Sequence, residues 1–218
     1  MSPLRLRYQT HEFNETDIHV RTLRDRQQFS DDEGIAEALG INSASWPLFG
    51  VVWDSSEVLA HLMFDYEIAG KRVLEVGCGI GLASLVLNHR LADITATDYH
   101  PEVEAFLLEN TKLNHGEEIP FTRTGWGDEI TDLGKFDLII GSDLLYEPDH
   151  VELLSAFLHQ HAKKDCEVII VDPGRAQRSK FSKKMVSLGY AHSQSRPDNS
   201  DYLEQPFQGL ILRYQRLH

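Results

Sequence analysis

A glycine-rich segment, Glu75-Val-Gly77-Cys-Gly79-Ile-Gly81, is the stretch of this sequence best suited to binding a ligand. It follows a short apolar run, Arg72–Val76, and precedes a stretch with a helical pattern. Glycines permit a tight turn and let the backbone approach a ligand closely. The free N–H groups and the positive dipole end of the following helix would face the same ligand. The segment therefore predicts a ligand-binding loop between a strand and a helix.

An acidic residue is placed to complete this site. Asp98 ends the next apolar run, 93–97, and lies 21 residues after Gly77. An acid at that position can accept hydrogen bonds from both hydroxyls of a ribose. The dinucleotide fingerprint also needs Gly or Ala three positions after its second glycine, and Leu82 stands there. The residues predict a ligand with a ribose and argue against NAD.

The runs around these residues alternate between strand and helix patterns. Strands are expected at 72–76, 93–97, 120–124, 136–140, 167–171 and 209–214, and helices from 54 or 55, at 82–91, 101–113, 151–161 and 176–188. This alternation predicts an α/β fold, a mostly parallel sheet with helices on both faces. Such sheets bind ligands at the carboxyl ends of their strands, so the residues that end each strand are the candidates for function.

The N-terminal part differs from the rest of the chain. Alternating residues in 4–8 and 18–23 predict a hairpin or edge strands. Residues 1–45 hold too few apolar side chains to fold alone, so we expect them to form an extension packed on a Rossmann-like core at 46–218. The length of 218 residues fits a single domain, 1–218.

The charge balance limits the possible partners. The formal net charge is −13, with 21 Lys and Arg against 34 Asp and Glu, and phosphate binding needs the opposite excess. We therefore expect neither nucleic acid nor a membrane as partner. The 2 cysteines are too few for a disulfide framework or a four-thiolate metal site. No metal is expected, and the absence of a signal peptide or a long apolar stretch predicts a cytoplasmic protein.

The glycine spacing resembles motif I of the class I S-adenosylmethionine-dependent methyltransferases. That motif has the pattern Gly-x-Gly-x-Gly with an acid two residues before the first glycine. In the family, the glycine loop lies along the methionine part of the cofactor and an acid at the position of Asp98 holds the ribose. The resemblance implies a seven-stranded Rossmann-like sheet, S-adenosylmethionine as cofactor, and a list of cofactor-binding residues that starts with Glu75, Gly77, Gly79, Gly81 and Asp98.

The end of the strand at 136–140 narrows the substrate class. Asp143-Leu-Leu-Tyr146 resembles the Asp-x-x-Tyr motif of the seven-strand protein-lysine methyltransferases, whereas enzymes that methylate amino groups of nucleic acids typically carry Asn-Pro-Pro-Tyr. Further similarity to this group lies in the Trp-led helix at 51–60, in Gly125-Trp126-Gly127 and in the strand end at 172–175. Over residues 46–190 the resemblance implies Asp143 and Tyr146 as catalytic residues and adds Trp53, Trp126 and Ser142 to the cofactor site.

The chemistry of lysine methylation fits these side chains. A lysine amine has a reference pKa of about 10.4 and must lose a proton before it attacks. An apolar channel lowers that pKa by desolvation. Asp143 can position the nitrogen, although its charge opposes deprotonation, and the Tyr146 ring can wall the channel and favour a cation. We therefore expect a methyltransferase that acts on a protein side-chain nitrogen, most simply lysine.

Several alternatives stay open. The acceptor could be a small-molecule amine or a histidine side chain. From other classes, the chain could be an NAD-dependent oxidoreductase or a cofactor-binding scaffold without activity. We interpret the 11 histidines as surface imidazoles and the basic run 175–184 as a solvated helix face. If the basic run is functional, it would orient an acidic partner near the pocket.

Overall fold

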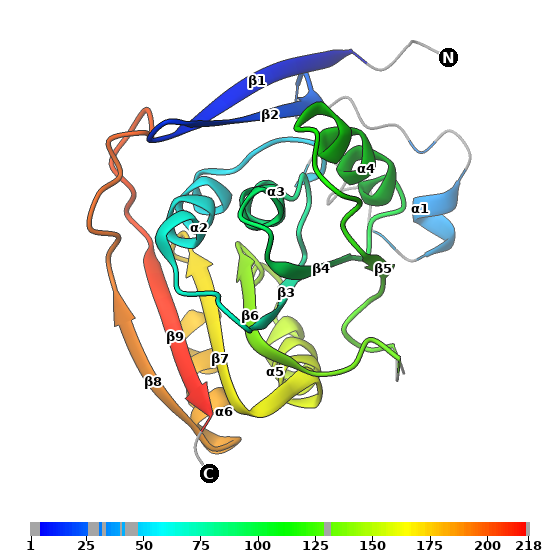
Figure 1. Ribbon diagram of the computed structural model, residues 1–218. Coiled ribbons are helices and arrows are strands. Elements are labelled where there is room, and N and C mark those ends of the chain that lie inside the picture. Colours follow the sequence, from blue (N-terminus) through cyan, green and yellow to red (C-terminus); the bar gives the residue numbers. More distant parts are fainter. Residues whose placement is uncertain are drawn as a thin grey trace.

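The computed structural model describes residues 5–25, 31, 34–39, 41, 48–128 and 132–216. A seven-stranded sheet with the order β5-β4-β3-β6-β7-β9-β8 forms its centre (Figure 1). The first five of these strands run parallel, and β9 is antiparallel to both β7 and β8. The bounds are β3 Arg72–Val76, β4 Asp93–Asp98, β5 Phe121–Arg123, β6 Phe136–Ser142, β7 Ala162–Asp172, β8 Tyr190–Ser195 and β9 Leu210–Arg216. The predicted α/β fold with a mostly parallel sheet is confirmed.

Helices cover both faces of the sheet, as Figure 1 shows. They are α1 Ile35–Ala38, α2 Asp54–Asp65, α3 Leu82–His89, α4 Val103–Leu113, α5 His150–His161 and α6 Arg178–Ser187. Successive strand residues point to opposite faces, so Val73 belongs to the core beneath α2, α3 and α4, while Leu74 belongs to the core beneath α5 and α6. Because both faces are buried, the central strands read as mostly apolar runs in the sequence.

The predicted N-terminal hairpin is present as a separate two-stranded sheet. Strands β1 (Leu6–Phe13) and β2 (Thr16–Leu23) pair antiparallel, and their buried side chains join the core that contains α2 and α3. Asn110 of α4 is fully buried and fixes the hairpin, because its side chain accepts a hydrogen bond from the Arg21 N–H at 2.7 Å and donates one to the Arg21 carbonyl at 3.2 Å. Leu4, where the predicted first strand begins, and Trp46, where the predicted core begins, lie outside the described residues.

Strands β7 and β8 of the sheet differ most from their prediction, and β1 of the hairpin runs to Phe13 rather than to residue 8. Strand β8 was not predicted, because only Tyr190 of its six residues is buried and the alternation that marks a strand is missing. Strand β7 begins at Ala162, five residues earlier than predicted, through a polar stretch that pairs Ala162 with Phe136 of β6. Among the described residues, no helix is long and apolar enough to cross a membrane.

Candidate active site

One cavity of about 500 Å³ lies at the carboxyl ends of β3, β4, β6 and β7. Parallel strands gather residues from distant parts of the chain at this edge, which is where such sheets bind ligands. Eight of the ten predicted site residues line the cavity: Trp53, Gly77, Gly79, Asp98, Trp126, Ser142, Asp143 and Tyr146. The other two, Glu75 and Gly81, are not part of the cavity wall formed by the described residues.

The glycine loop supplies one side of the cavity with backbone. Gly77 and Gly79 have φ of 60° and 57°, a left-handed conformation that residues with a Cβ rarely adopt. A Cβ at Gly77 would come within 2.6 Å of Leu144 Cδ2, so the Leu144 side chain would have to move to admit another residue there. A Cβ at Gly79 would meet no protein atom within 4 Å and would lie in open space. The space beside Gly79 therefore suits a ligand that lies directly on the backbone.

Glu75 supports the loop from within the fold. Its carboxylate is 1% exposed and accepts hydrogen bonds from the backbone N–H of Ser84, at 2.9 Å, and from the Ser84 hydroxyl. Desolvation raises the Glu75 pKa to about 7, although the hydrogen bonds from Ser84 oppose the shift. Glu75 thus holds the first turn of α3 against β3, and its contact with the cofactor stays a prediction. Gly81 is the N-cap residue of α3 and serves the same turn.

Asp98 lies where the ribose prediction requires it. One carboxylate oxygen accepts a hydrogen bond from the Gly79 N–H at 2.9 Å, and the other accepts one from the His100 N–H at 2.8 Å. An ionised carboxylate has about four acceptor sites, so each oxygen can take a further hydrogen bond from a ligand in the cavity. Desolvation raises the Asp98 pKa, and the backbone hydrogen bonds act in the opposite direction.

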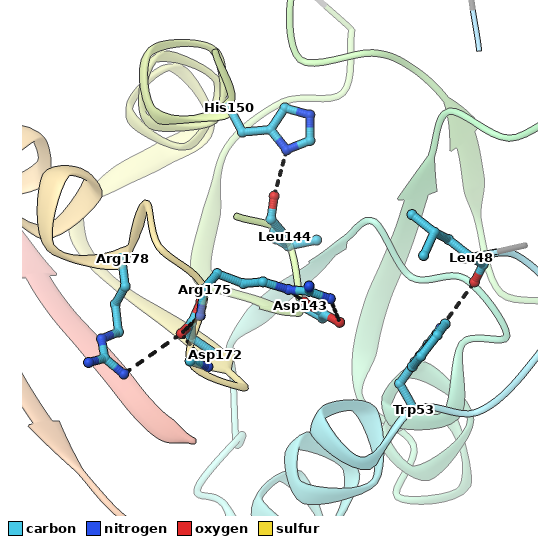
Figure 2. Close-up of polar contacts among 9 residues, drawn as sticks. Leu48, Trp53, Asp143, Leu144, His150, Asp172, Arg175 and Arg178 are labelled. Carbon is cyan, nitrogen blue, oxygen red and sulfur yellow. Dashed lines mark hydrogen bonds and ion pairs between the residues drawn. The ribbon is translucent and has the colours of Figure 1, made fainter. Parts of the chain in front are cut away.

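Three rings, one of them Trp126, which was expected in the cofactor site, pack together and form an aromatic wall of the cavity. The His150 ring packs edge-on against Trp126, at 4.8 Å between centroids, and against Tyr146, at 4.6 Å. Because the carbonyl of Leu144 can only accept, His150 Nδ1 carries the proton of their 2.7 Å hydrogen bond (Figure 2). The interpretation of the histidines as surface groups is wrong for His150, which lines the cavity, and for His11, His100 and His161, which are buried.

Tyr146 keeps its phenolic proton in this wall. Desolvation is the main cause that raises its pKa to about 12, and the carboxylates of Asp98, Glu147 and Asp143 add to the shift. Its role is therefore that of a neutral ring and hydroxyl. Trp53, the N-cap residue of α2, lies on another side of the cavity, and its indole N–H donates a 3.0 Å hydrogen bond to the Leu48 carbonyl (Figure 2).

Asp143 is held in an ion pair that the sequence did not reveal. Arg175, in the segment after β7, donates from Nε to Oδ1 at 2.6 Å and from Nη2 to Oδ2 at 2.7 Å, as Figure 2 shows. The expectation that the basic run is a solvated helix face is therefore wrong for Arg175, which lines the cavity. It holds for Lys180 and Lys183 of α6, which are exposed. Asp143 therefore lines the cavity with its negative charge already paired with Arg175.

The cavity thus has two ends with different chemistry. At one end, Gly79 and Asp98 offer backbone and acceptor groups to a nucleoside ligand. At the other, the aromatic wall and the Asp143–Arg175 pair can receive a second molecule. Such a site can align two reactants in one desolvated space, which is a large part of what catalysis of a group transfer requires.

Comparison with known proteins identifies the family and the fold. Residues 42–187 match the model of a family described as lysine methyltransferase. The chain is 32% identical over 139 residues to the protein N-lysine methyltransferase METTL21A of Danio rerio, covering 59% of this chain and 63% of that protein. It is 31% identical over 138 residues to the electron transfer flavoprotein beta subunit lysine methyltransferase of Xenopus laevis, covering 61% of this chain and 55% of that protein. The matched region therefore spans less than two thirds of these relatives.

Solved structures share the fold at lower identity. A ribosomal protein L11 methylase from Lactobacillus delbrueckii subsp. bulgaricus superposes with a TM-score of 0.61 at 22% identity, covering 79% of this chain and 83% of that chain. A magnesium protoporphyrin IX methyltransferase from Synechocystis PCC 6803, solved with bound SAM, has a TM-score of 0.59 at 19% identity, covering 75% and 78%. These structures establish the methyltransferase type of Rossmann-like fold.

Proposed function

The chain belongs to the lysine methyltransferase family, and from this premise we propose that it transfers a methyl group from S-adenosylmethionine to the side-chain nitrogen of a lysine in a protein. The membership agrees with the resemblance to the seven-strand protein-lysine methyltransferases and argues against the NAD-dependent oxidoreductase alternative. The observation that carries the proposal is that a single cavity joins the Gly79 and Asp98 end to the Asp143 and Tyr146 end.

The residues at the first end fit the cofactor. Gly79 leaves the backbone open, with no protein atom where a Cβ would stand, and Asp98 has acceptor sites left for the two ribose hydroxyls. Gly77 and Ser142 line the same wall. When bound, S-adenosylmethionine supplies a methyl group that its sulfonium already activates.

The residues at the second end suit an amine that arrives on a long, flexible side chain. Trp126, His150 and Tyr146 present rings that would displace part of the water around the nitrogen, although Tyr146 itself is 41% exposed, and desolvation favours the neutral amine over the ammonium. Asp143 holds the nitrogen in line with the methyl group, a positioning role that needs no proton transfer to the carboxylate.

A protein histidine stays open as the acceptor. The chain is 29% identical over 121 residues to the histidine protein methyltransferase 1 homolog of Dictyostelium discoideum, covering 52% of this chain and 39% of that protein. Lysine is favoured because the family description and two of the relatives described above carry that name. A nucleic-acid acceptor is not expected at a net charge of −13.

The proposal is tested with S-adenosylmethionine that carries a deuterated methyl group. The chain is incubated with the lysate of a strain from which its gene has been deleted, and proteins are digested and analysed by mass spectrometry. We expect the label on lysine side chains of one or a few proteins, above a matched reaction without the chain. Label on histidine, label only on small amines, or no label at all would each reject the lysine assignment.

A further inference from the structure

The pairing of Asp143 with Arg175 leaves the Asp143 carboxylate itself without an unpaired charge at the cavity. Both carboxylate oxygens are engaged, by two parallel N–H groups of one guanidinium at 2.6 Å and 2.7 Å. Such bidentate pairs are among the strongest charge-assisted hydrogen bonds in proteins. The Asp143 side chain is 13% exposed and that of Arg175 is 37% exposed, so the pair sits at the cavity and keeps part of the guanidinium in contact with solvent.

Both partners of the pair are fixed by their backbones. Asp143 has a φ of 53°, a left-handed conformation that costs free energy in a residue with a Cβ, and its N–H donates to the Val171 carbonyl at 2.9 Å. The N–H of Arg175 donates to the fully buried Asp172 at 3.0 Å. The surroundings of Asp143 hold its backbone in this strained conformation. Its carboxylate faces the guanidinium and is not free to follow a substrate.

We infer that Arg175 sets the protonation state of the acceptor: by cancelling the charge of Asp143, it makes this end of the cavity bind the acceptor as a neutral amine rather than as an ammonium ion. This inference rests on the proposed function and adds a positioning residue to it. An opposite charge within about 4–6 Å raises the pKa of an amine by about 1–3 units, so an unpaired Asp143 would trap the acceptor as an unreactive ammonium. With the pair intact, Asp143 no longer compensates the ammonium charge, and the rings of the aromatic wall favour the neutral amine where they displace water from the nitrogen.

The proton is then released before the transfer. The ammonium loses its proton to solvent as it enters, so the nitrogen lone pair is free to form the new C–N bond. The C–S bond breaks with its electron pair left on sulfur, and the positive charge passes to the methylated nitrogen. Asp143 accepts a hydrogen bond from the neutral amine through a remaining lone pair, which aligns the nitrogen without holding a proton on it.

Other ionisable groups face the pair from neighbouring elements. Tyr146 after β6 and Asp172 at the end of β7 interact with the pair directly. Beyond them lie Glu147 after β6, Asp98 at the end of β4 and Arg178 of α6, and Asp149 and His150 line the same cavity. These groups are the same in every variant compared below. Differences between variants of Arg175 and Asp143 therefore report the charge of the pair itself.

The test measures how the affinity for n-butylamine, which reproduces a lysine side chain, depends on pH. Calorimetric titrations of the full chain saturated with S-adenosylhomocysteine are run between about pH 7.5 and pH 9, below the reference pKa of about 10.4 of the amine. A site that binds only the neutral amine gains about ten-fold in apparent affinity per pH unit, because the neutral fraction rises ten-fold. A site that binds the ammonium shows a flat profile.

We expect the ten-fold slope for the wild-type chain and a nearly flat profile for Arg175→Gln, in which Asp143 is unpaired. The charge-neutral double variant Asp143→Asn/Arg175→Gln should regain the slope, which a merely structural role of Arg175 would not produce. Lys180→Gln, which removes an exposed lysine of α6, is the matched control and should keep the wild-type slope. Unchanged affinity for S-adenosylhomocysteine shows that each variant is folded.

A flat profile for the wild-type chain, no binding of the amine, or an unchanged slope in Arg175→Gln would overturn the inference. The wild-type slope tests it even if a variant does not fold. These outcomes are distinct from a failure of the proposed function, which would appear as missing methyl-lysine in the mass-spectrometric assay.

Discussion

Ser84 donates two hydrogen bonds to the buried carboxylate of Glu75, one from its backbone N–H and one from its hydroxyl. This contact joins the end of β3 to the first turn of α3, the two elements that flank the glycine loop, and so fixes both ends of the loop. Because Glu75 is 1% exposed, it has no contact with solvent to favour its charged form. The burial of Glu75 therefore affects how the stability of the fold depends on pH, and this effect can be measured without any ligand.

We predict that Glu75→Gln changes how stability depends on pH. The folded pKa of about 7 lies above the ordinary glutamate value of 4.5, so the folded state prefers the protonated acid. The stabilisation by Glu75 is complete below the unfolded pKa and is lost as pH rises through the folded pKa, up to roughly 3 kcal/mol. The free energy of unfolding of Glu75→Gln, relative to that of the wild type, should therefore increase as the pH rises from about 4.5 to about 7.

Denaturant titrations at several pH values measure this difference. The difference between the variants is the useful quantity, because burial lowers the pKa of His100 to about 4 and gives the wild type an opposite slope in part of the same range. Glu104→Gln, at an exposed position of α4, should track the wild type at every pH. A constant difference between Glu75→Gln and the wild type would show that Glu75 is ionised in the folded state across this range.

Gly79→Ala should separate the ligand role of the loop from its folding role. The left-handed φ of 57° makes any Cβ cost about 1–2 kcal/mol, and no protein atom stands in the way. Gly70, with a φ of 69° and equally open surroundings, lies outside the cavity and gives the matched control. Both alanine variants should lose similar stability, while only Gly79→Ala loses about ten-fold or more in affinity for S-adenosylhomocysteine, measured by calorimetry. Equal affinities in the two variants would remove Gly79 from the cofactor site.

Asp98→Ala should weaken binding of S-adenosylhomocysteine by about ten-fold or more, since each hydrogen bond to a charged group contributes about 1.5–3 kcal/mol. The ligand-induced rise in melting temperature should shrink accordingly. Asp93→Ala, at the exposed start of the same strand, is the control and should keep the full rise. An unchanged rise in Asp98→Ala would mean that this carboxylate only holds the Gly79 and His100 N–H groups.

The central part of the fold could be predicted from the sequence because burial leaves a strong pattern. Three of the five positions of strand 72–76 and four of the five of strand 136–140 are apolar, since both faces of the sheet are covered. Strand β8 was not predicted because it is an edge strand whose exposed residues are mostly polar. The seventh strand was implied only by the resemblance to the methyltransferases.

The site was predictable as a set of positions rather than as a set of side-chain interactions. The carboxyl ends of parallel strands meet at one edge, so the positions of Asp98 and Asp143 followed from the strand pattern. The ion pair between Asp143 and Arg175 did not, because it depends on side-chain directions across 32 residues of sequence. His150 was missed for the same reason: its packing between two aromatic rings leaves no pattern in the sequence.

The most direct test of the two-ended cavity is a comparison of Asp143→Asn with the wild type in two measurements on the same preparations. Calorimetry gives the affinity for S-adenosylhomocysteine, and transfer of labelled methyl groups to lysate proteins at saturating S-adenosylmethionine gives turnover. We predict unchanged affinity and a turnover lower by about ten-fold or more, because the transition state then lacks one charge-assisted hydrogen bond. Loss of S-adenosylhomocysteine binding together with unchanged turnover at saturating cofactor would place Asp143 in the cofactor site and contradict the division of the cavity into two ends.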